Sequence, residues 1–218
     1  MQALRALPLA ALILVAPAAR ACDVALMLAI DVSGSIDPGE YRIQMDGTAN
    51  ALSDPEVAEA LSAAQARIAL MQWSAGGMQD LGIGWRTIDT PADARALAEE
   101  VRVLPRAYKG ADTAVGEALG FAADRFDPVA DCRRRVIDVS GDGAQNAGLP
   151  LAPLRAKALA LGIEINALAI ESIGVSITVY YQRFVVSPGG FVMTVSGHVD
   201  YPRAIRAKIL REIGKPVG

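Results

Sequence analysis

The chain lacks the features that mark several common classes of protein. Basic residues do not outnumber acidic ones, with 21 Lys and Arg against 24 Asp and Glu, so the strongly basic surface of a nucleic-acid-binding protein is missing. There is no internal repeat, low-complexity tract or linker, and no hydrophobic segment after residue 21 is long enough to cross a membrane. These absences favour one domain, residues 22–218, and we expect it to be soluble.

Signals of catalysis are also scarce. His198 is the only histidine, and no Gly-x-Ser-x-Gly turn occurs, so a Ser-His-Asp hydrolase lacks its usual parts. No activated nucleophile or matched acid–base pair is visible, and we expect a protein that is not an enzyme. A lone histidine in a loop is most often exposed, which is our expectation for His198.

Residues 1–21 have the layout of a secretory signal peptide. Arg5 is an early positive charge, Ala6–Ala19 is apolar and uncharged, and Ala19 and Ala21 are small residues where a signal peptidase reads the chain. The apolar stretch is shorter than the roughly 20 residues that span a bilayer. We therefore expect a secreted or periplasmic protein. A lipoprotein is the alternative, because a cysteine would follow the cleavage, but Arg20 fits a lipid-attachment sequence poorly.

Cys22 and Cys132 are the only cysteines, and an exported chain meets an oxidising compartment. Each immediately precedes an apolar run that we expect to be a strand. If the two strands are parallel neighbours, both sulfurs lie at the same end of the sheet, so we predict a disulfide. A bridge closing so long a loop would stabilise the fold by about 4 kcal/mol. The sequence leaves open a pair of unrelated thiols, one of them buried.

Apolar runs alternate with helical patterns along the chain. Continuous apolar runs are typical of parallel strands covered on both faces. The five runs of this kind are Val24–Ile30, Arg67–Trp73, Val136–Ser140, Ile163–Ile170 and Gly190–Val195, and the more polar Asp80–Asp89 is expected at an edge. Helix starts are indicated at Asp37-Pro38, Asp54-Pro55 and Thr90-Pro91, and helical spacing at Thr113–Phe126 and at Ile205, Ile209 and Ile213. We expect Trp73 and Trp85 to pack in the sheet and at its edge.

This alternation predicts a doubly wound α/β domain. We expect a mostly parallel, six-stranded sheet with helices on both faces and one antiparallel edge strand. Ligands of such sheets bind beyond the carboxyl ends of the strands. Three polar clusters fall there or in loops on the same side: Asp31–Ser35, Gly110–Thr113 and Ser140–Gly143.

The residues in these clusters suit a hard divalent cation, Mg²⁺ or alternatively Mn²⁺ or Ca²⁺. Hydroxyl oxygens can come from Ser33, Ser35 and Thr113, while Asp31 and Asp142 can supply charge directly or hold bound waters. If hydroxyls dominate, the ion keeps much of its positive charge and can accept a carboxylate from another molecule. Asp112 and Ser140 are candidates for supporting roles.

The pattern Asp31-x-Ser33-x-Ser35, then Thr113, then Asp142 resembles the metal-ion-dependent adhesion site of von Willebrand factor A domains. The resemblance covers essentially all of residues 22–218. The tail from Tyr180-Tyr181 through Gly189–Val192 to Lys208–Ile213 looks like a bacterial branch of unassigned function. The resemblance implies a binding module whose protein partner offers an Asp or Glu carboxylate to the cation. It also implies that the first strand and the Val136 strand are adjacent, which supports the Cys22–Cys132 bridge.

Other interpretations of these residues stay open. Ser33 and Ser35 can cap the following helix, Thr113 can be a plain N-cap, and Asp142 can be an ordinary turn residue. A metal-dependent phosphatase also starts from an aspartate after a first strand, but the haloacid-dehalogenase type needs a carboxylate where this chain has Ser33. A third possibility is a structural interaction domain that binds no metal.

Overall fold

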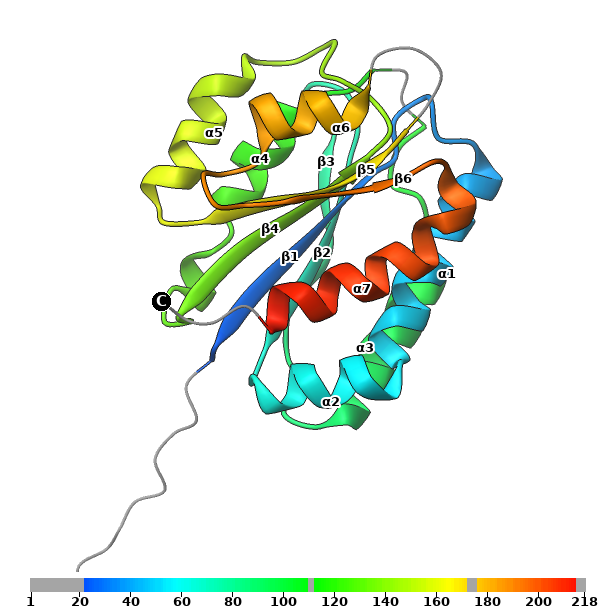
Figure 1. The fold of residues 1–218 in the computed structure, drawn as a ribbon, viewed down its shortest axis with the longest axis vertical. Coiled ribbons are helices and arrows are strands. Elements are labelled where there is room, and N and C mark those ends of the chain that lie inside the picture. Colours follow the sequence, from blue (N-terminus) through cyan, green and yellow to red (C-terminus); the bar gives the residue numbers. More distant parts are fainter. Residues whose placement is uncertain (1–21, 110–111, 172–175, 215–218) are drawn as a thin grey trace, which may run out of the picture.

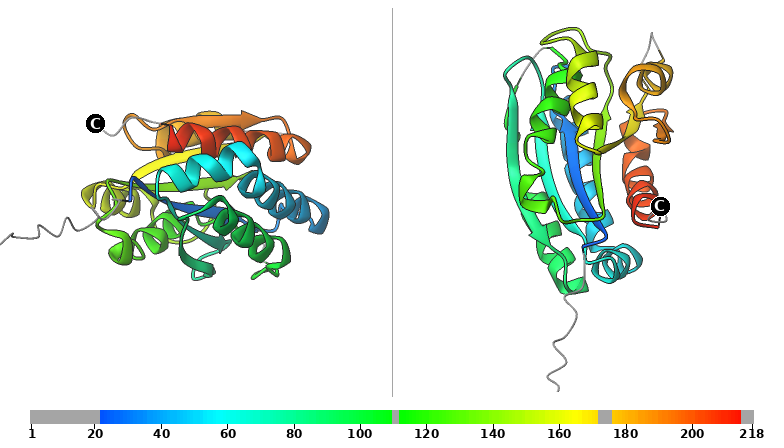
Figure 2. Two further views of the ribbon diagram at one scale, coloured as in Figure 1. Left: turned by 90° about the horizontal axis from the view of Figure 1, so that it is seen from below. Right: turned by 90° about the vertical axis from the view of Figure 1, so that its left-hand side faces the viewer.

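The computed structural model describes residues 22–109, 112–171 and 176–214. The expected signal peptide, residues 1–21, lies outside the described residues, as do Gly110, Ala111 and residues 215–218. The described part is a six-stranded sheet between two layers of helices (Figure 1). Figure 2 gives the same layers from two other directions.

The sheet has the predicted number and directions of strands. Its spatial order is β3-β2-β1-β4-β5-β6, and every neighbouring pair is parallel except β2 and β3, which are antiparallel. The expected mostly parallel sheet with one antiparallel edge strand is therefore confirmed. The strands are β1 (Val24–Asp31), β2 (Arg67–Trp73), β3 (Gln79–Thr87), β4 (Arg134–Gly141), β5 (Glu164–Ile170) and β6 (Val192–Val195).

Helices cover both faces of the sheet. One face carries α1 (Pro38–Ser53), α2 (Pro55–Ala63), α3 (Pro91–Val103) and α7 (Tyr201–Ile213), and the other carries α4 (Val115–Ala123), α5 (Leu151–Ala160), α6 (Ile177–Tyr180) and the π-helical turn η2 (Tyr181–Val185). Two short 3₁₀ turns, η1 (Asp127–Val129) and η3 (His198–Asp200), complete the described elements. None of the described helices combines the length and the apolar character needed to cross a bilayer.

The strands are apolar along their length because both faces are buried. In β1, Leu26 and Leu28 belong to the core under α1 and α7, while Ala25 and Met27 belong to the core under α4 and α5. A strand with only one buried face would alternate apolar and polar residues. Trp73 is fully buried and Trp85 contacts Phe126 edge-on at the antiparallel edge, so both pack as predicted.

Local capping explains where the helices begin. Asp37 accepts a hydrogen bond from the Glu40 N–H, and the Glu40 carboxylate accepts one from the Asp37 N–H, which forms a capping box at the start of α1. Asp54 caps α2 in a similar way through the N–H groups of Glu56 and Val57. The helix expected over Thr113–Phe126 is shorter, since α4 spans Val115–Ala123.

The predicted disulfide is present. Cys22 and Cys132 are joined with a Cα–Cα distance of 4.6 Å, and β1 and β4 are parallel neighbours with Val24 paired to Arg134. The bridge therefore fastens the amino ends of these two strands.

The expectation for His198 is wrong. The side chain is buried, because η3 lies against the start of α1 and places the imidazole Nδ1 3.1 Å from a Glu40 carboxylate oxygen. The loop position suggested exposure because the contact with α1 joins residues far apart in the sequence.

Candidate metal centre

The carboxyl ends of β1 and β4 bring two of the predicted clusters together. Ile30 is paired with Ser140, so Asp31 at the end of β1 lies beside Gly141 at the end of β4. The turn 31–35 follows one strand and Asp142 follows the other. Adjacent parallel strands thus place side chains from distant parts of the sequence together at the carboxyl end of the sheet. We call this place, formed by the turn 31–35 and Asp142, the rim.

A chain of hydrogen bonds links four of the five predicted metal ligands. Asp31 Oδ1 accepts a hydrogen bond from the Ser33 N–H at 2.7 Å. The hydroxyl oxygens of Ser33 and Ser35 lie 3.2 Å apart, and Ser35 Oγ donates to Asp142 Oδ1 at 2.6 Å. The serines do not cap α1, whose N-cap is Asp37, and Asp142 does more than close a turn.

Thr113 reaches the same rim from the loop before α4. Its hydroxyl oxygen lies 3.1 Å from the point where a Cβ on Gly143 would stand, directly after Asp142. The backbone of Thr113 is fixed by Asn146, whose Oδ1 accepts from the Thr113 N–H at 2.8 Å and whose N–H donates to the Thr113 carbonyl. Thr113 is not the helix N-cap, because that position belongs to Ala114.

The two carboxylates of the rim are buried, whereas Ser35 is exposed. Asp31 is fully buried and Asp142 nearly so. The pKa of Asp31 is raised to about 7: burial is the largest cause and the Asp142 charge adds to it, while hydrogen bonds from Ser33 and from the Asp142 backbone oppose the shift. Asp31 Oδ2 is buried without a hydrogen-bond partner among the described residues. A buried acidic oxygen without a donor is the environment that a cation compensates.

The available ligands fit a hard cation. Hydroxyl and carboxylate oxygens suit Mg²⁺, Mn²⁺ or Ca²⁺ better than softer metals. Across the described ranges, no three His, Cys, Asp or Glu side chains gather as a metal site. A cation at this rim would therefore depend on the serine and threonine hydroxyls as well as on the two carboxylates.

Three residues that sequence reasoning missed brace the turn. Arg106 donates from Nη2 to the carbonyls of Val32 and Ser33, at 2.9 Å each. The buried Gln72 amide holds the backbone on both sides of Arg106, because it donates to the Pro105 carbonyl and accepts from the Ala107 N–H. The buried Gln44 amide donates to the Asp31 carbonyl. Gln72 was detectable in principle, since it is a polar residue near the end of an apolar strand.

Tyr181 is a further missed residue at the rim. Its ring is fully buried at the start of η2, and its hydroxyl has no hydrogen-bond partner among the described residues. Burial raises the pKa of Tyr181 well above its ordinary value, and the nearby charges of Asp31 and Asp142 raise it further, so the phenol keeps its proton.

The hydrogen bonds of the two residues expected to support the site are made to residues outside the rim. Ser140 Oγ is 3.3 Å from the Tyr201 hydroxyl, which comes from α7 on the opposite face of the sheet. Asp112 is exposed, and its contact with Ser74 is made by the backbone carbonyl. Through these contacts, neither residue joins the series of hydrogen bonds from Asp31 to Asp142.

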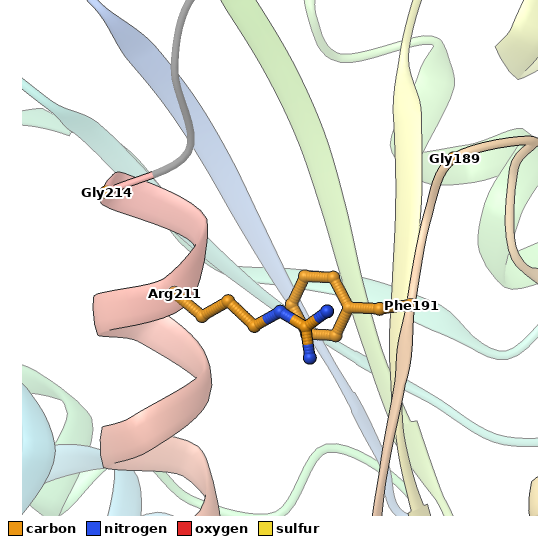
Figure 3. Close-up of a pocket in the computed structure, with 4 residues that line it drawn as sticks. All are labelled: Gly189, Phe191, Arg211 and Gly214. Atoms are coloured by element: carbon orange, nitrogen blue, oxygen red, sulfur yellow. The ribbon is translucent and has the colours of Figure 1, made fainter.

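A separate surface cavity of about 380 Å³ lies at the other end of the strands (Figure 3). It is lined by Gly189, Phe191, Arg211 and Gly214, and the Arg211 guanidinium stacks over the Phe191 ring at 3.8 Å. None of the predicted site residues lines it, so it is distinct from the rim.

Solved structures with the same fold belong to the von Willebrand factor A class. Proximal thread matrix protein 1 from the mussel byssus matches with a TM-score of 0.67 and 18% identity over 88% of this chain and 49% of that chain. The von Willebrand factor type A protein of Catenulispora acidiphila matches with a TM-score of 0.65 and 16% identity, over 89% of this chain and 43% of that chain. The vWF domain of the pili tip protein Mfa5 of Porphyromonas gingivalis matches with a TM-score of 0.62 and 10% identity, over 91% of this chain and 98% of that chain. This chain spans about half the length of the mussel protein. The fold is therefore that of a von Willebrand factor A domain.

The family assignment is narrower. Residues 21–217 match the family described as "Protein of unknown function (DUF1194)", and the chain belongs to that family. No curated protein matches the sequence.

Proposed function

We propose that the chain is a cation-dependent binding module rather than an enzyme. The observation that carries the proposal is the hydrogen-bonded run from Asp31 through Ser33 and Ser35 to Asp142, beside the unpaired Asp31 Oδ2. A second mussel thread matrix structure has a zinc-occupied MIDAS motif, with 19% identity and a TM-score of 0.67. A divalent cation at the matching residues of this chain, Mg²⁺ in the first place, is the simplest extension.

Each residue has a role in this proposal. The hydroxyls of Ser33, Ser35 and Thr113 would bind the ion without neutralising it, and Asp31 and Asp142 would hold it directly or through waters. The bound ion supplies positive charge at an open coordination position. An Asp or Glu carboxylate of a partner protein is the ligand that this charge favours.

We further propose that residues 22–218 form a von Willebrand factor A domain exported after a signal peptide, residues 1–21. The Cys22–Cys132 bridge supports export, because disulfides persist mainly in oxidising compartments. The structural neighbours named as pilus proteins also support it.

Cation binding is tested by calorimetric titration with MgCl₂ and MnCl₂. We expect Ser35→Ala and Asp142→Ala to weaken binding about 10–100-fold or more, since each removes an oxygen from the rim. Ser53→Ala is the matched control, because its hydroxyl donates to the Asn50 carbonyl near the far end of α1. Undiminished binding in both rim variants would exclude this site.

Carboxylate capture is tested in the same preparation. Two peptides of identical sequence, one with a single Asp and the other with Asn in its place, are titrated with Mg²⁺ and then with chelator. We expect only the Asp peptide to bind, and only with Mg²⁺. Equal binding of both peptides would contradict carboxylate capture while leaving cation binding intact.

A further inference from the structure

Two buried oxygens beside the candidate metal centre have no hydrogen-bond partner among the described residues. They are Asp31 Oδ2 and the Tyr181 hydroxyl oxygen. Both approach Gly141, at 2.8 Å and 2.6 Å from the point where a Cβ on that residue would stand. A buried unpaired polar group destabilises a fold, so two that converge on one point need an explanation.

Packing explains the Tyr181 ring but not its hydroxyl. The ring belongs to the core under α4 and α5, where a phenylalanine would fill the same space. The hydroxyl instead approaches the Asp31 carboxylate, the first residue of the rim. The side chain comes from η2, a π-helical turn, and such turns occur frequently at functional sites.

We propose that Tyr181 is a positioning residue of the metal centre: in the cation-loaded state its hydroxyl donates a hydrogen bond to Asp31 Oδ2, directly or through one water. The inference rests on the proposed function. With Oδ1 held by the Ser33 N–H, a donor on Oδ2 fixes the whole Asp31 carboxylate at the start of the turn. Groups that orient metal ligands in this way typically change metal affinity by about 10–100-fold.

This role differs measurably from a purely structural one. If the hydroxyl acts only in the loaded state, removing it leaves the metal-free fold as stable as before or more so. A structural hydroxyl would contribute equally with and without the cation. The comparison of metal affinity with metal-free stability therefore separates the two.

The test compares Tyr181→Phe with the unaltered chain. We expect the affinity for Mg²⁺ and Mn²⁺, measured by calorimetry, to fall about 10-fold or more. We expect the melting temperature in chelator to stay equal or rise, and the increase in melting temperature on adding Mg²⁺ to shrink. Mg²⁺ should also change the ultraviolet absorption of tyrosine in the unaltered chain, a signal that needs no variant to fold.

Tyr201→Phe is the matched control. Tyr201 is equally buried, but its hydroxyl already has partners, Ser140 Oγ at 3.3 Å and Thr48 Oγ1 at 3.4 Å, on the opposite face of the sheet. We expect this variant to melt at a lower temperature in chelator, to keep its metal affinity and to retain the tyrosine absorption change.

The outcomes separate the two proposals. Unchanged affinity in Tyr181→Phe, or no tyrosine absorption change in a chain that binds Mg²⁺, overturns the role of Tyr181 and leaves the proposed function standing. An unaltered chain that binds neither Mg²⁺ nor Mn²⁺ overturns both.

Discussion

At the scale of single residues, the rim depends on Gly141, because a glycine has no side chain to occupy the space there. Gly141 ends β4 between Asp31 and Tyr181. A methyl group there would lie 2.6 Å from the Tyr181 hydroxyl oxygen and 2.8 Å from Asp31 Oδ2, which is closer than unbonded atoms approach. The absence of a Cβ thus lets the two oxygens come near the strand.

We expect Gly141→Ala to lower the free energy of unfolding by about 1–3 kcal/mol, the usual cost of overpacking a buried site. Urea denaturation in the presence of chelator measures this without any contribution from the cation. Gly84→Ala, in β3, is the matched control, because a Cβ at that strand glycine meets nothing within 4 Å. Equal stability of the two variants would show that Gly141 has room for a side chain.

Sequence reasoning identified the residues of the rim better than their surroundings. Asp31, Ser33, Ser35 and Asp142 come together, as their positions after predicted strands and the family resemblance imply, and Thr113 reaches the same rim beside Gly143. Arg106, Gln72 and Tyr181 were missed because their contacts join segments far apart in the chain. No local periodicity indicates that a π-helical turn will point a tyrosine hydroxyl at the first strand.

At the scale of elements, α7 is held on the sheet by buried charges. Lys208 Nζ lies 2.6 Å from Asp138 Oδ1 of β4 and 2.6 Å from Glu212 Oε1, and all three residues are at most 1% exposed. Asn166 of β5 donates to the same Glu212 oxygen. The apolar stripe of α7 was predicted, and Ile205 and Ile209 are buried, but the charged group was not. Charged side chains are rarely buried unless paired, and Asp138, the partner of Lys208 on the sheet, is 70 residues away in sequence.

This buried group makes stability depend on pH. The pKa of Glu212 is raised to about 8: burial is the largest cause and the Asp138 charge adds to it, while Lys208 and Asn166 oppose the shift. The folded state thus binds the Glu212 proton more tightly than the unfolded chain does. The contribution of Glu212 to stability is present at low pH and is lost as the pH rises toward 8, by at most about 1.4 kcal/mol per pH unit.

Glu212→Gln should therefore flatten the decline of stability between pH 5 and 8, because the amide does not titrate. Urea denaturation at several pH values measures the slope. Glu100→Gln is the control, since Glu100 forms an exposed pair with Arg86 and should leave the slope unchanged. A slope in Glu212→Gln as steep as in the unaltered chain would assign the pH dependence to other groups.

At the scale of the whole molecule, the site is a product of strand order. Asp31 and Asp142 meet because β1 and β4 are parallel neighbours, and the Cys22–Cys132 bridge ties the same two strands at their other ends. The apolar runs predicted which segments form strands, since burial on both faces leaves a clear pattern. They did not determine which strands are adjacent, because that depends on packing over the entire sheet. The resemblance to von Willebrand factor A domains implied that the first strand and the Val136 strand are adjacent, and the structure confirms this pairing.

The most direct test of the cation site is anomalous diffraction from a crystal of the chain grown with MnCl₂. We predict a manganese peak at the rim between Asp31 and Asp142, within about 2.5 Å of the Ser33 and Ser35 hydroxyl oxygens. A map with no manganese at this rim, or with manganese bound only elsewhere on the molecule, would contradict the account.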